Sequence, residues 1–295
     1  MRLDLVSTIS RLLQGKPARQ TETPAKAEAP SAVTMLLDRL TVNRVLRNAR
    51  FAGDADLEAV LKGGKLGKGA KGDGVAKLQQ ALQDMAFTVP GGADGAYGGN
   101  SAQAVKNFQS MAGLPPTGEV DAATLAALDQ HAPPVGKTSW DAGVNPGPVP
   151  NPDLGNGKKA RVVVDISQHR LFLFDKNGDV EKIYGVRTGN GQKGWGTQPG
   201  VKVIDGKNND PKSVAQALWG GTGNAFGTRL LNLTDYDVET GKKYLGKHKG
   251  QELHGTFDDQ SIGKDYSHGC VGLTNRDVEE IFDKLGNGEF VRFDK

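Results

Sequence analysis

The residues of this chain that could do chemistry gather in one stretch, Leu253–Leu273, with the sequence LHGTFDDQSIGKDYSHGCVGL. It contains the only cysteine of the 295-residue chain, Cys270, and two of its five histidines, His254 and His268. A thiol is a strong nucleophile as the thiolate, and a nearby imidazole is the usual base that removes its proton at neutral pH. The stretch therefore indicates a thiol nucleophile with a histidine base.

Small and hydroxyl-bearing residues surround this cysteine. Gly269 permits a sharp turn, which would aim the backbone N–H groups of residues 269 and 270 at one point, as an oxyanion hole requires. Ser267 or Thr256 could orient an imidazole ring through a hydrogen bond. The stretch thus supplies the parts of an acyl-transfer site.

Two other interpretations fit the same residues. A single cysteine is often a buried, unreactive apolar side chain. Two histidines and one cysteine are also acceptable zinc ligands, but the stretch lacks a second cysteine and an obvious fourth ligand. We expect no metal and no other cofactor.

Length and composition predict about two domains in a turn-rich, largely β protein, because hydrophobic residues make up 37% and glycines number 41. No apolar run is long enough to span a bilayer. The first twenty residues lack the continuous apolar segment of a secretory signal. Residues 1–72 carry 13 Lys and Arg against 7 Asp and Glu. No aromatics or nucleic-acid fold signature accompany this charge, so we expect a solvated arm and no nucleic-acid partner.

Composition shifts divide the chain into four parts. Residues 1–71 read as a tail with a linker and either an accessory helix over Val33–Phe51 or a weakly ordered spacer. Residues 72–131 show helical periodicity that predicts a small three-helix domain, with N-caps at Asp73, Ser101 and Asp121. Residues 132–158 are a Pro- and Gly-rich linker with Trp140 as an anchor, and residues 159–295 form a mainly β domain.

Within residues 159–295 the strongest strand signals are Arg161–Ser167, His169–Asp175 and Val180–Thr188, followed by Val201–Ile204. Residues 205–249 are Gly-rich and polar, which predicts a long loop that is either a lid or substrate wall, or a plain surface loop.

The end of this region is more regular. After Cys270, Thr274 with Asp277 three residues later predicts a helix N-terminus, and Gly286 marks its end. Glu289–Phe293 predicts a closing strand.

Residues Gly72–Gln130 contain three further sequence elements: KGDGVAKLQQAL, DGAYGGNSAQAVKNFQ and GLPPTGEVDAATLAAL. With these the segment resembles the peptidoglycan-binding domain family of the three-helix type. The resemblance implies a non-catalytic module that holds an enzyme on the cell wall. The alternative is a module that only packs against the rest of the chain or acts as a spacer, without binding a ligand.

The catalytic stretch also follows a pattern. Twelve residues, beginning with Gly255 and including Ser261–Lys264, separate His254 from Ser267-His-Gly-Cys270, and LTNRD follows. This resembles the L,D-transpeptidase catalytic domain, which implies a mainly β, sandwich-like fold. It also implies that Cys270 attacks peptidoglycan stem tetrapeptides and forms a thioester with release of D-Ala.

The same resemblance gives His254 the general acid–base role and leaves His268 to shape the pocket. The acyl group would pass to an amine of a neighbouring stem, forming a 3→3 cross-link. Water as acceptor would make the protein a carboxypeptidase, and a free D-amino acid would make it an exchange enzyme. The residues do not choose between these acceptors.

One departure from the family pattern concerns substrate binding. Many family members carry Arg two residues after the cysteine, where its fork could bind a carboxylate, but this chain has Gly272. We expect Gly255, Ser267 and Gly272 to border the substrate, and Arg229, Arg276 or a lysine to anchor it.

Two alternatives keep the peptidoglycan partner but change the function. The protein could be a catalytically idle wall-binding scaffold, or a cell-wall-targeting antibacterial effector delivered by a specialised secretion machine. Either way the resemblance places its action in the bacterial periplasm or cell wall, with an export route that the sequence does not indicate.

Overall fold

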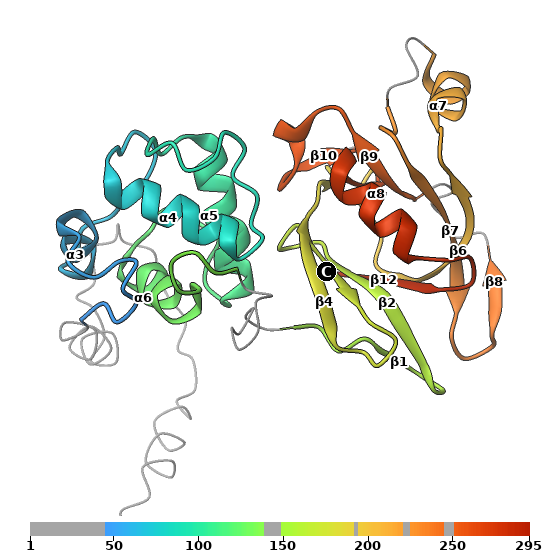
Figure 1. Ribbon diagram of the computed structural model, residues 1–295, viewed down its shortest axis with the longest axis horizontal. Coiled ribbons are helices and arrows are strands. Elements are labelled where there is room, and N and C mark those ends of the chain that lie inside the picture. The colour runs from blue at the N-terminus through green and yellow to red at the C-terminus, as the bar shows by residue number, and fades with distance from the viewer. Residues whose placement is uncertain (1–44, 139–148, 192–193, 221–224, 245–250) are drawn as a thin grey trace, which may run out of the picture. The chain divides into compact units, whose positions relative to one another are not determined.

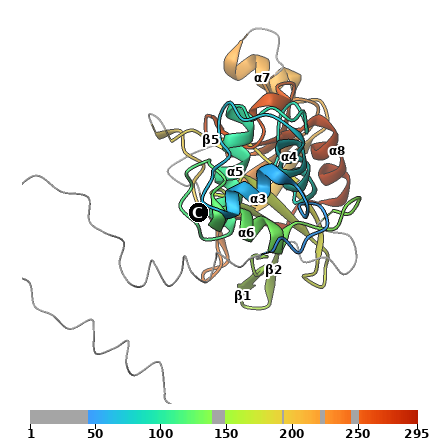
Figure 2. The same cartoon turned by 90° about the vertical axis from the view of Figure 1, so that its left-hand side faces the viewer.

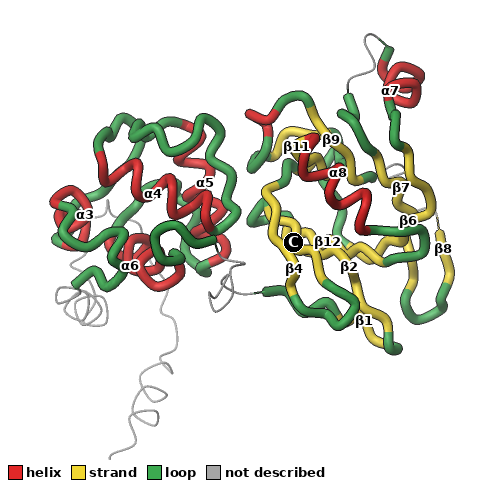
Figure 3. Tube along the Cα trace, viewed as in Figure 1, coloured by secondary structure: helices red, strands yellow, loops and turns green. Residues whose placement is uncertain are grey.

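The protein is described by a computed structural model over residues 45–138, 149–191, 194–220, 225–244 and 251–295. Helices dominate the described residues before position 139 and strands dominate those after position 149 (Figure 3). Most of the predicted Val33–Phe51 helix and the predicted anchor Trp140 lie outside the described residues, while residues 45–51 form loop and turns.

The described residues 45–138, the helical module, form four helices, which can be followed in Figures 1 and 2. They are α3 (Ala55–Leu61), α4 (Asp73–Asp84), α5 (Gly99–Met111) and α6 (Ala122–His131). The three-helix prediction is confirmed by α4–α6, and α3 was not expected. The module has a continuous apolar core, to which every helix contributes fully or nearly fully buried side chains; they include Leu57, Leu78, Leu82, Phe108 and Leu125.

The predicted N-caps were right in one of three cases. Asp121 caps α6, because its carboxylate accepts the N–H of Thr124 at 2.8 Å. Asp73 is instead the first residue of α4. Ser101 lies inside α5, where its buried hydroxyl accepts a hydrogen bond from Gln79 at 3.0 Å.

The second module is built on one curled, mixed sheet in the order β11-β9-β7-β6-β12-β2-β3-β4, with β1 paired to β2 and β8 to β7. A separate parallel pair joins β5 and β10. The strands are β1 (Asp153–Gly155), β2 (Lys158–Asp165), β3 (Arg170–Phe174), β4 (Val180–Gly185), β5 (Thr188–Gly189), β6 (Gly200–Asn208), β7 (Leu230–Asp237), β8 (Lys242–Tyr244), β9 (Leu253–Thr256), β10 (Asp265–Ser267), β11 (Val271–Thr274) and β12 (Phe290–Asp294).

The strands predicted at Arg161–Ser167, His169–Asp175, Val180–Thr188 and Glu289–Phe293 are confirmed as β2, β3, β4 and β12. The strand predicted at Val201–Ile204 is part of β6. The prediction of a long loop over residues 205–249 was wrong for most of its described part. That part contains the end of β6, α7 (Lys212–Trp219), β7 and β8. β7 is an interior strand between β6 and β9, because it pairs with both neighbours.

Helix α8 (Asn275–Lys284) follows β11 directly and covers the end of the sheet formed by β9 and β11 (Figure 1). Its buried residues Val278 and Ile281 share a core with Leu253, Val271 and Leu273. The predicted cap is confirmed, because Thr274 Oγ1 accepts the N–H of Asp277 at 3.2 Å. Within the described residues, no helix combines the length and apolarity needed to cross a membrane.

We predict that Thr274→Ala lowers the free energy of unfolding by about 1 kcal/mol, because it removes the hydroxyl that caps α8. Chemical denaturation monitored by circular dichroism would measure the change. Thr274→Ser keeps the acceptor oxygen and is the matched control. Equal loss in both variants would contradict a capping role.

Candidate active site

The parallel pairing of β9 with β11 brings the two ends of the predicted catalytic stretch together. Its register sets Leu253 opposite Val271 and His254 opposite Gly272. Leu253 and Val271 are fully buried in the core. Because side chains alternate along a strand, His254 and Cys270 lie on the other face of this pair.

That face borders a cavity of about 460 Å³, within the usual size range of small-molecule sites. The residues that line it come from both ends of the catalytic stretch, from the segment before β7 and from the segment between β4 and β5. They are Arg187, Ala225, Phe226, His254, Thr256, Phe257, Asp258, Tyr266, Ser267, His268 and Cys270. The predicted nucleophile and base therefore share one cavity.

The ring of His254 is held in one tautomer. Its Nδ1 lies 2.6 Å from the carbonyl oxygen of Gly255, and a carbonyl oxygen can only accept, so Nδ1 carries the proton. Nε2 is then the unprotonated nitrogen. Burial, and after it the charge of Arg187, lowers the pKa of His254 to about 4, against the opposing effect of the Gly255 bond. The imidazole is thus a neutral base at neutral pH.

Cys270 is part-buried, and its surroundings favour the thiol over the thiolate. Burial and then the carboxyl of Glu252 raise the pKa of Cys270 to about 12. A hydrogen bond from the Glu252 backbone and the charge of Arg187 act in the opposite direction. The resting site therefore holds a neutral thiol beside a neutral imidazole.

A tight turn presents Cys270 to the cavity. Ser267 Oγ donates to the carbonyl oxygen of Cys270 at 2.5 Å and accepts the Gly269 N–H at 3.2 Å. Gly269 has φ +120°, a conformation that favours glycine. Its carbonyl accepts the Thr197 hydroxyl at 2.9 Å. One of the two N–H groups predicted for the oxyanion is therefore engaged by Ser267 in this state.

The exposed imidazole of His268 also borders the cavity. Its ring lies against Trp195, with centroids 4.0 Å apart. His268 thus forms part of the cavity wall.

Four predicted substrate-binding residues lie outside the lining of this cavity: Gly255, Gly272, Arg229 and Arg276. Gly255 packs against the start of α8, where an added Cβ would lie 2.4 Å from Asn275 Oδ1. Arg229 donates to the carbonyl oxygens of Asn209 and Thr228. The Arg276 side chain is 89% exposed and pairs with its neighbour Asp277.

Two charged residues of the site were not predicted. Glu252 precedes His254 by two residues and so lies on the same face of the strand. This two-residue spacing could have been read from the sequence. Burial raises the pKa of Glu252 to about 7. Arg187 lines the cavity from a segment far away in the sequence. It lies beside the remaining predicted residue, Gly272, and exchanges two backbone hydrogen bonds with it at 2.8 and 3.0 Å.

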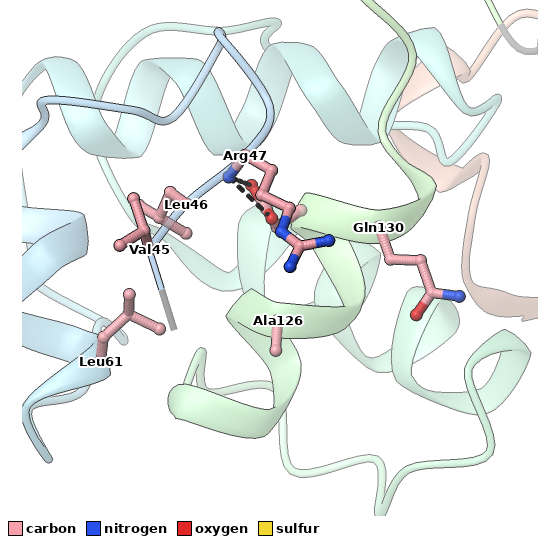
Figure 4. Close-up of a pocket in the computed structure, with 7 residues that line it drawn as sticks. Val45, Leu46, Arg47, Leu61, Ala126 and Gln130 are labelled. Atoms are coloured by element: carbon pink, nitrogen blue, oxygen red, sulfur yellow. Dashed lines mark hydrogen bonds between the residues drawn. The ribbon is translucent and has the colours of Figure 1, made fainter. Parts of the chain in front are cut away.

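A second cavity, of about 560 Å³, lies in the helical module and is lined by Val45, Leu46, Arg47, Leu61, Ala126, Asp129 and Gln130 (Figure 4). The Asp129 carboxylate there accepts the backbone N–H groups of Arg47 and Asn48. These lining residues include no cysteine or histidine. Among the described residues, no three His, Cys, Asp or Glu side chains are grouped to hold a metal ion.

Comparison with known families supports the two-module division. Residues 71–128 match the peptidoglycan binding domain family, and residues 159–292 match the L,D-transpeptidase catalytic domain family, as the motifs predicted.

Among curated proteins, N-acetylmuramoyl-L-alanine amidase CwlL of Bacillus licheniformis is 30% identical over 163 residues, which are 52% of this chain and 45% of that protein. A probable N-acetylmuramoyl-L-alanine amidase of the same organism is 32% identical over 137 residues, or 43% of this chain and 38% of that protein. The chain thus spans less than half the length of these relatives.

Among solved structures, an L,D-transpeptidase (residues 123–326) from Xylanimonas cellulosilytica is 24% identical, with a TM-score of 0.44; the match covers 78% of this chain and 97% of that one. An L,D-transpeptidase from Stackebrandtia nassauensis is 22% identical, with a TM-score of 0.35, over 78% and 95% of the two chains.

We predict that iodoacetamide alkylates Cys270 at about pH 8 roughly 100-fold or more slowly in the folded protein than in guanidinium chloride. Each unit by which a pKa is raised lowers the thiolate population about tenfold below that pKa. Because the folded-state pKa is the higher one, the folded rate should keep rising above about pH 9, where the unfolded rate levels off. Mass spectrometry of the single cysteine measures both rates.

Glu252→Gln provides the control, because it removes the negative neighbour that raises the thiol pKa. It should speed alkylation of the folded protein and leave the unfolded rate unchanged. A folded wild-type rate equal to the unfolded rate would mean that the folded site does not raise the pKa of Cys270.

Proposed function

From the match of residues 159–292 to the L,D-transpeptidase catalytic domain, we propose that this chain is a cysteine-dependent acyltransferase acting on peptidoglycan. Its donor would be a stem tetrapeptide, cleaved between the diamino acid at the third position and the terminal D-Ala. The observation that carries this proposal is that Cys270 and His254 border one cavity from two paired strands of that domain.

The first half of the reaction is acylation. Cys270 Sγ attacks the donor carbonyl carbon while its proton passes to Nε2 of His254, the nitrogen left unprotonated by the Gly255 bond. Proton transfer accompanies attack, because neither group is charged beforehand. The resulting imidazolium then gives its proton to the leaving nitrogen, so that D-Ala departs as an amine and a thioester remains.

The oxyanion formed during attack needs donors from the turn before β11. The backbone N–H groups of Gly269 and Cys270 are the proposed pair. The Gly269 N–H is shared with Ser267 Oγ at 3.2 Å, a length at the weak end for a hydrogen bond. A negatively charged oxygen would compete well for this donor.

Deacylation reverses the proton path. An amine of a neighbouring stem attacks the thioester, His254 takes its proton and returns one to the departing sulfur, and a 3→3 cross-link results. Water or a free D-amino acid would follow the same path, giving a carboxypeptidase or an exchange enzyme. The helical module would hold the enzyme on peptidoglycan, in line with its match over residues 71–128.

We predict that Cys270→Ala and His254→Ala each lower the rate of D-Ala release from tetrapeptide muropeptides by about 1,000-fold or more, because each removes one half of a unit that acts together. Mass analysis of the products measures the release. His268→Ala, which alters only the wall of the cavity, should cost about tenfold or less. Near wild-type activity in Cys270→Ala or His254→Ala would dismiss the assigned roles.

A catalytically idle wall-binding protein is the rival function, and reaction with a carbapenem separates the two. We predict that intact wild-type protein gains the mass of one carbapenem, located at Cys270, and that Cys270→Ala gains none. The reason is that a strained cyclic amide can be opened by the thiol and His254 without an acceptor. An unmodified Cys270 after prolonged incubation would favour the idle scaffold.

A further inference from the structure

Arg187 is a buried cation beside the nucleophile. Its side chain is only 9% exposed, yet it lines the cavity that contains Cys270 and His254. Burying a guanidinium costs free energy unless its charge and its N–H donors are matched. Its position at the cavity wall therefore calls for a partner.

The protein supplies few partners for this guanidinium. Within the part of the chain that the structure describes, the guanidinium donates one hydrogen bond, from Nη1 to Ser261 Oγ at 3.1 Å, and Nε is buried without an acceptor. Tyr266 offers a ring face at 5.9 Å. Among the described residues, no carboxylate lies within ion-pair distance of Arg187. Burial lowers the pKa of Arg187, and the charge of Asp258, which also lines the cavity, is the largest effect that opposes this.

Gly272 provides the space that this side chain occupies. A Cβ on Gly272 would lie 2.4 Å from Arg187 Nε, 2.8 Å from Cγ and 3.0 Å from Cδ, closer than real contacts allow. Any side chain at position 272 would have to displace the stem of Arg187. Glycine at this position and arginine at position 187 therefore form one arrangement.

We propose that Arg187 binds a carboxylate of the acyl donor next to the scissile carbonyl, and that Gly272 is the gap that lets it reach the cavity. This inference rests on the proposed function for the identity of the donor. A stem tetrapeptide has two carboxylates that could reach this place: that of the terminal D-Ala, bonded through one carbon to the leaving nitrogen, and the side-chain carboxylate of a diaminodicarboxylic acid at the third position.

The chemistry favours the terminal carboxylate. It is fixed to the leaving group, so binding it orients the scissile carbonyl toward Cys270. Arginine offers a planar fork of N–H donors that matches a carboxylate, and Nε, which lacks an acceptor, belongs to that fork. Arg187 is thus a specificity-determining residue, and Arg229 and Arg276, which lie outside the cavity lining, are not.

Binding can be measured without turnover in a Cys270→Ala background. Titration calorimetry would compare three tetrapeptides: one with both carboxylates free, one with a C-terminal carboxamide, and one amidated on the third residue. We expect the C-terminal carboxamide to bind about 10- to 100-fold more weakly than the free acid, because a charge-assisted bond is lost. A loss confined to the third-residue amide would assign Arg187 to that carboxylate instead. Equal binding of all three peptides would overturn the proposal.

Variants then test the residue. Arg187→Gln should weaken the free acid about 10- to 100-fold and abolish its advantage over the carboxamide, and Arg187→Lys should restore part of it. Arg276→Gln tests the rival anchor, and Arg292→Gln, whose guanidinium pairs with Asp294 on β12, is the matched control. An advantage for the free acid that survives Arg187→Gln, or disappears in Arg276→Gln, would refute the assignment.

Gly272→Ala tests the gap itself. It should lower affinity for the free acid about as much as Arg187→Gln does, and add little when combined with it, because both remove one interaction. If the losses of binding free energy in Gly272→Ala and Arg187→Gln were fully additive in the double variant, the coupling between these two residues would be refuted. If Arg187→Gln does not fold, the three peptides on the Cys270→Ala protein still decide the proposal. Preserved discrimination by a protein that releases no D-Ala would refute the proposed reaction and leave this inference standing.

Discussion

The parallel pairing of β9 with β11 is the constraint on which this site depends. Parallel strands need a crossover connection, and here it consists of the residues between His254 and Cys270, which return to the same end of the sheet. The register places His254 beside Gly272, so Cys270, two residues before Gly272, lies on the same face as His254. A slip of one residue would send Cys270 into the core that now holds Val271.

Burial then determines how the two groups can react. The apolar core beneath the strands and the ring of Phe226, 4.9 Å from that of His254, keep both groups in their neutral forms. The Gly255 carbonyl fixes the tautomer. Reactivity in this arrangement depends on bringing a carbonyl to the thiol, because the charges develop only as the bond forms.

Local sequence patterns were sufficient to predict the elements that are stabilised by interactions between residues close together in the sequence. The cap at Thr274 and the stop at Gly286 predicted α8. Residue type and spacing indicated Cys270 with a histidine base, and the family resemblance selected His254. β7 was missed because Gly and polar residues around it dominated the composition of residues 205–249, while its strand character comes from pairing on both sides.

The charged surroundings of the site were harder to predict for a related reason. Arg187 reaches Gly272 through an isolated bridge between segments far apart in the sequence, and no spacing rule links them. The alternation of side chains along a strand could have predicted that Glu252 shares a face with His254. Its raised pKa, however, depends on burial that only the folded sheet creates. The tautomer of His254 likewise depends on the three-dimensional position of a backbone carbonyl.

The protonated state of Cys270 has a consequence for the durability of the protein. Thiolates attack peroxides and disulfides far faster than thiols do, and the product of the reaction with a peroxide, a sulfenic acid, is no longer a nucleophilic thiol. The raised pKa of Cys270 leaves little thiolate at neutral pH, so this sulfur is expected to react slowly with such oxidants. The same burial that delays ionisation thus serves as an antioxidant defence, without requiring a second cysteine.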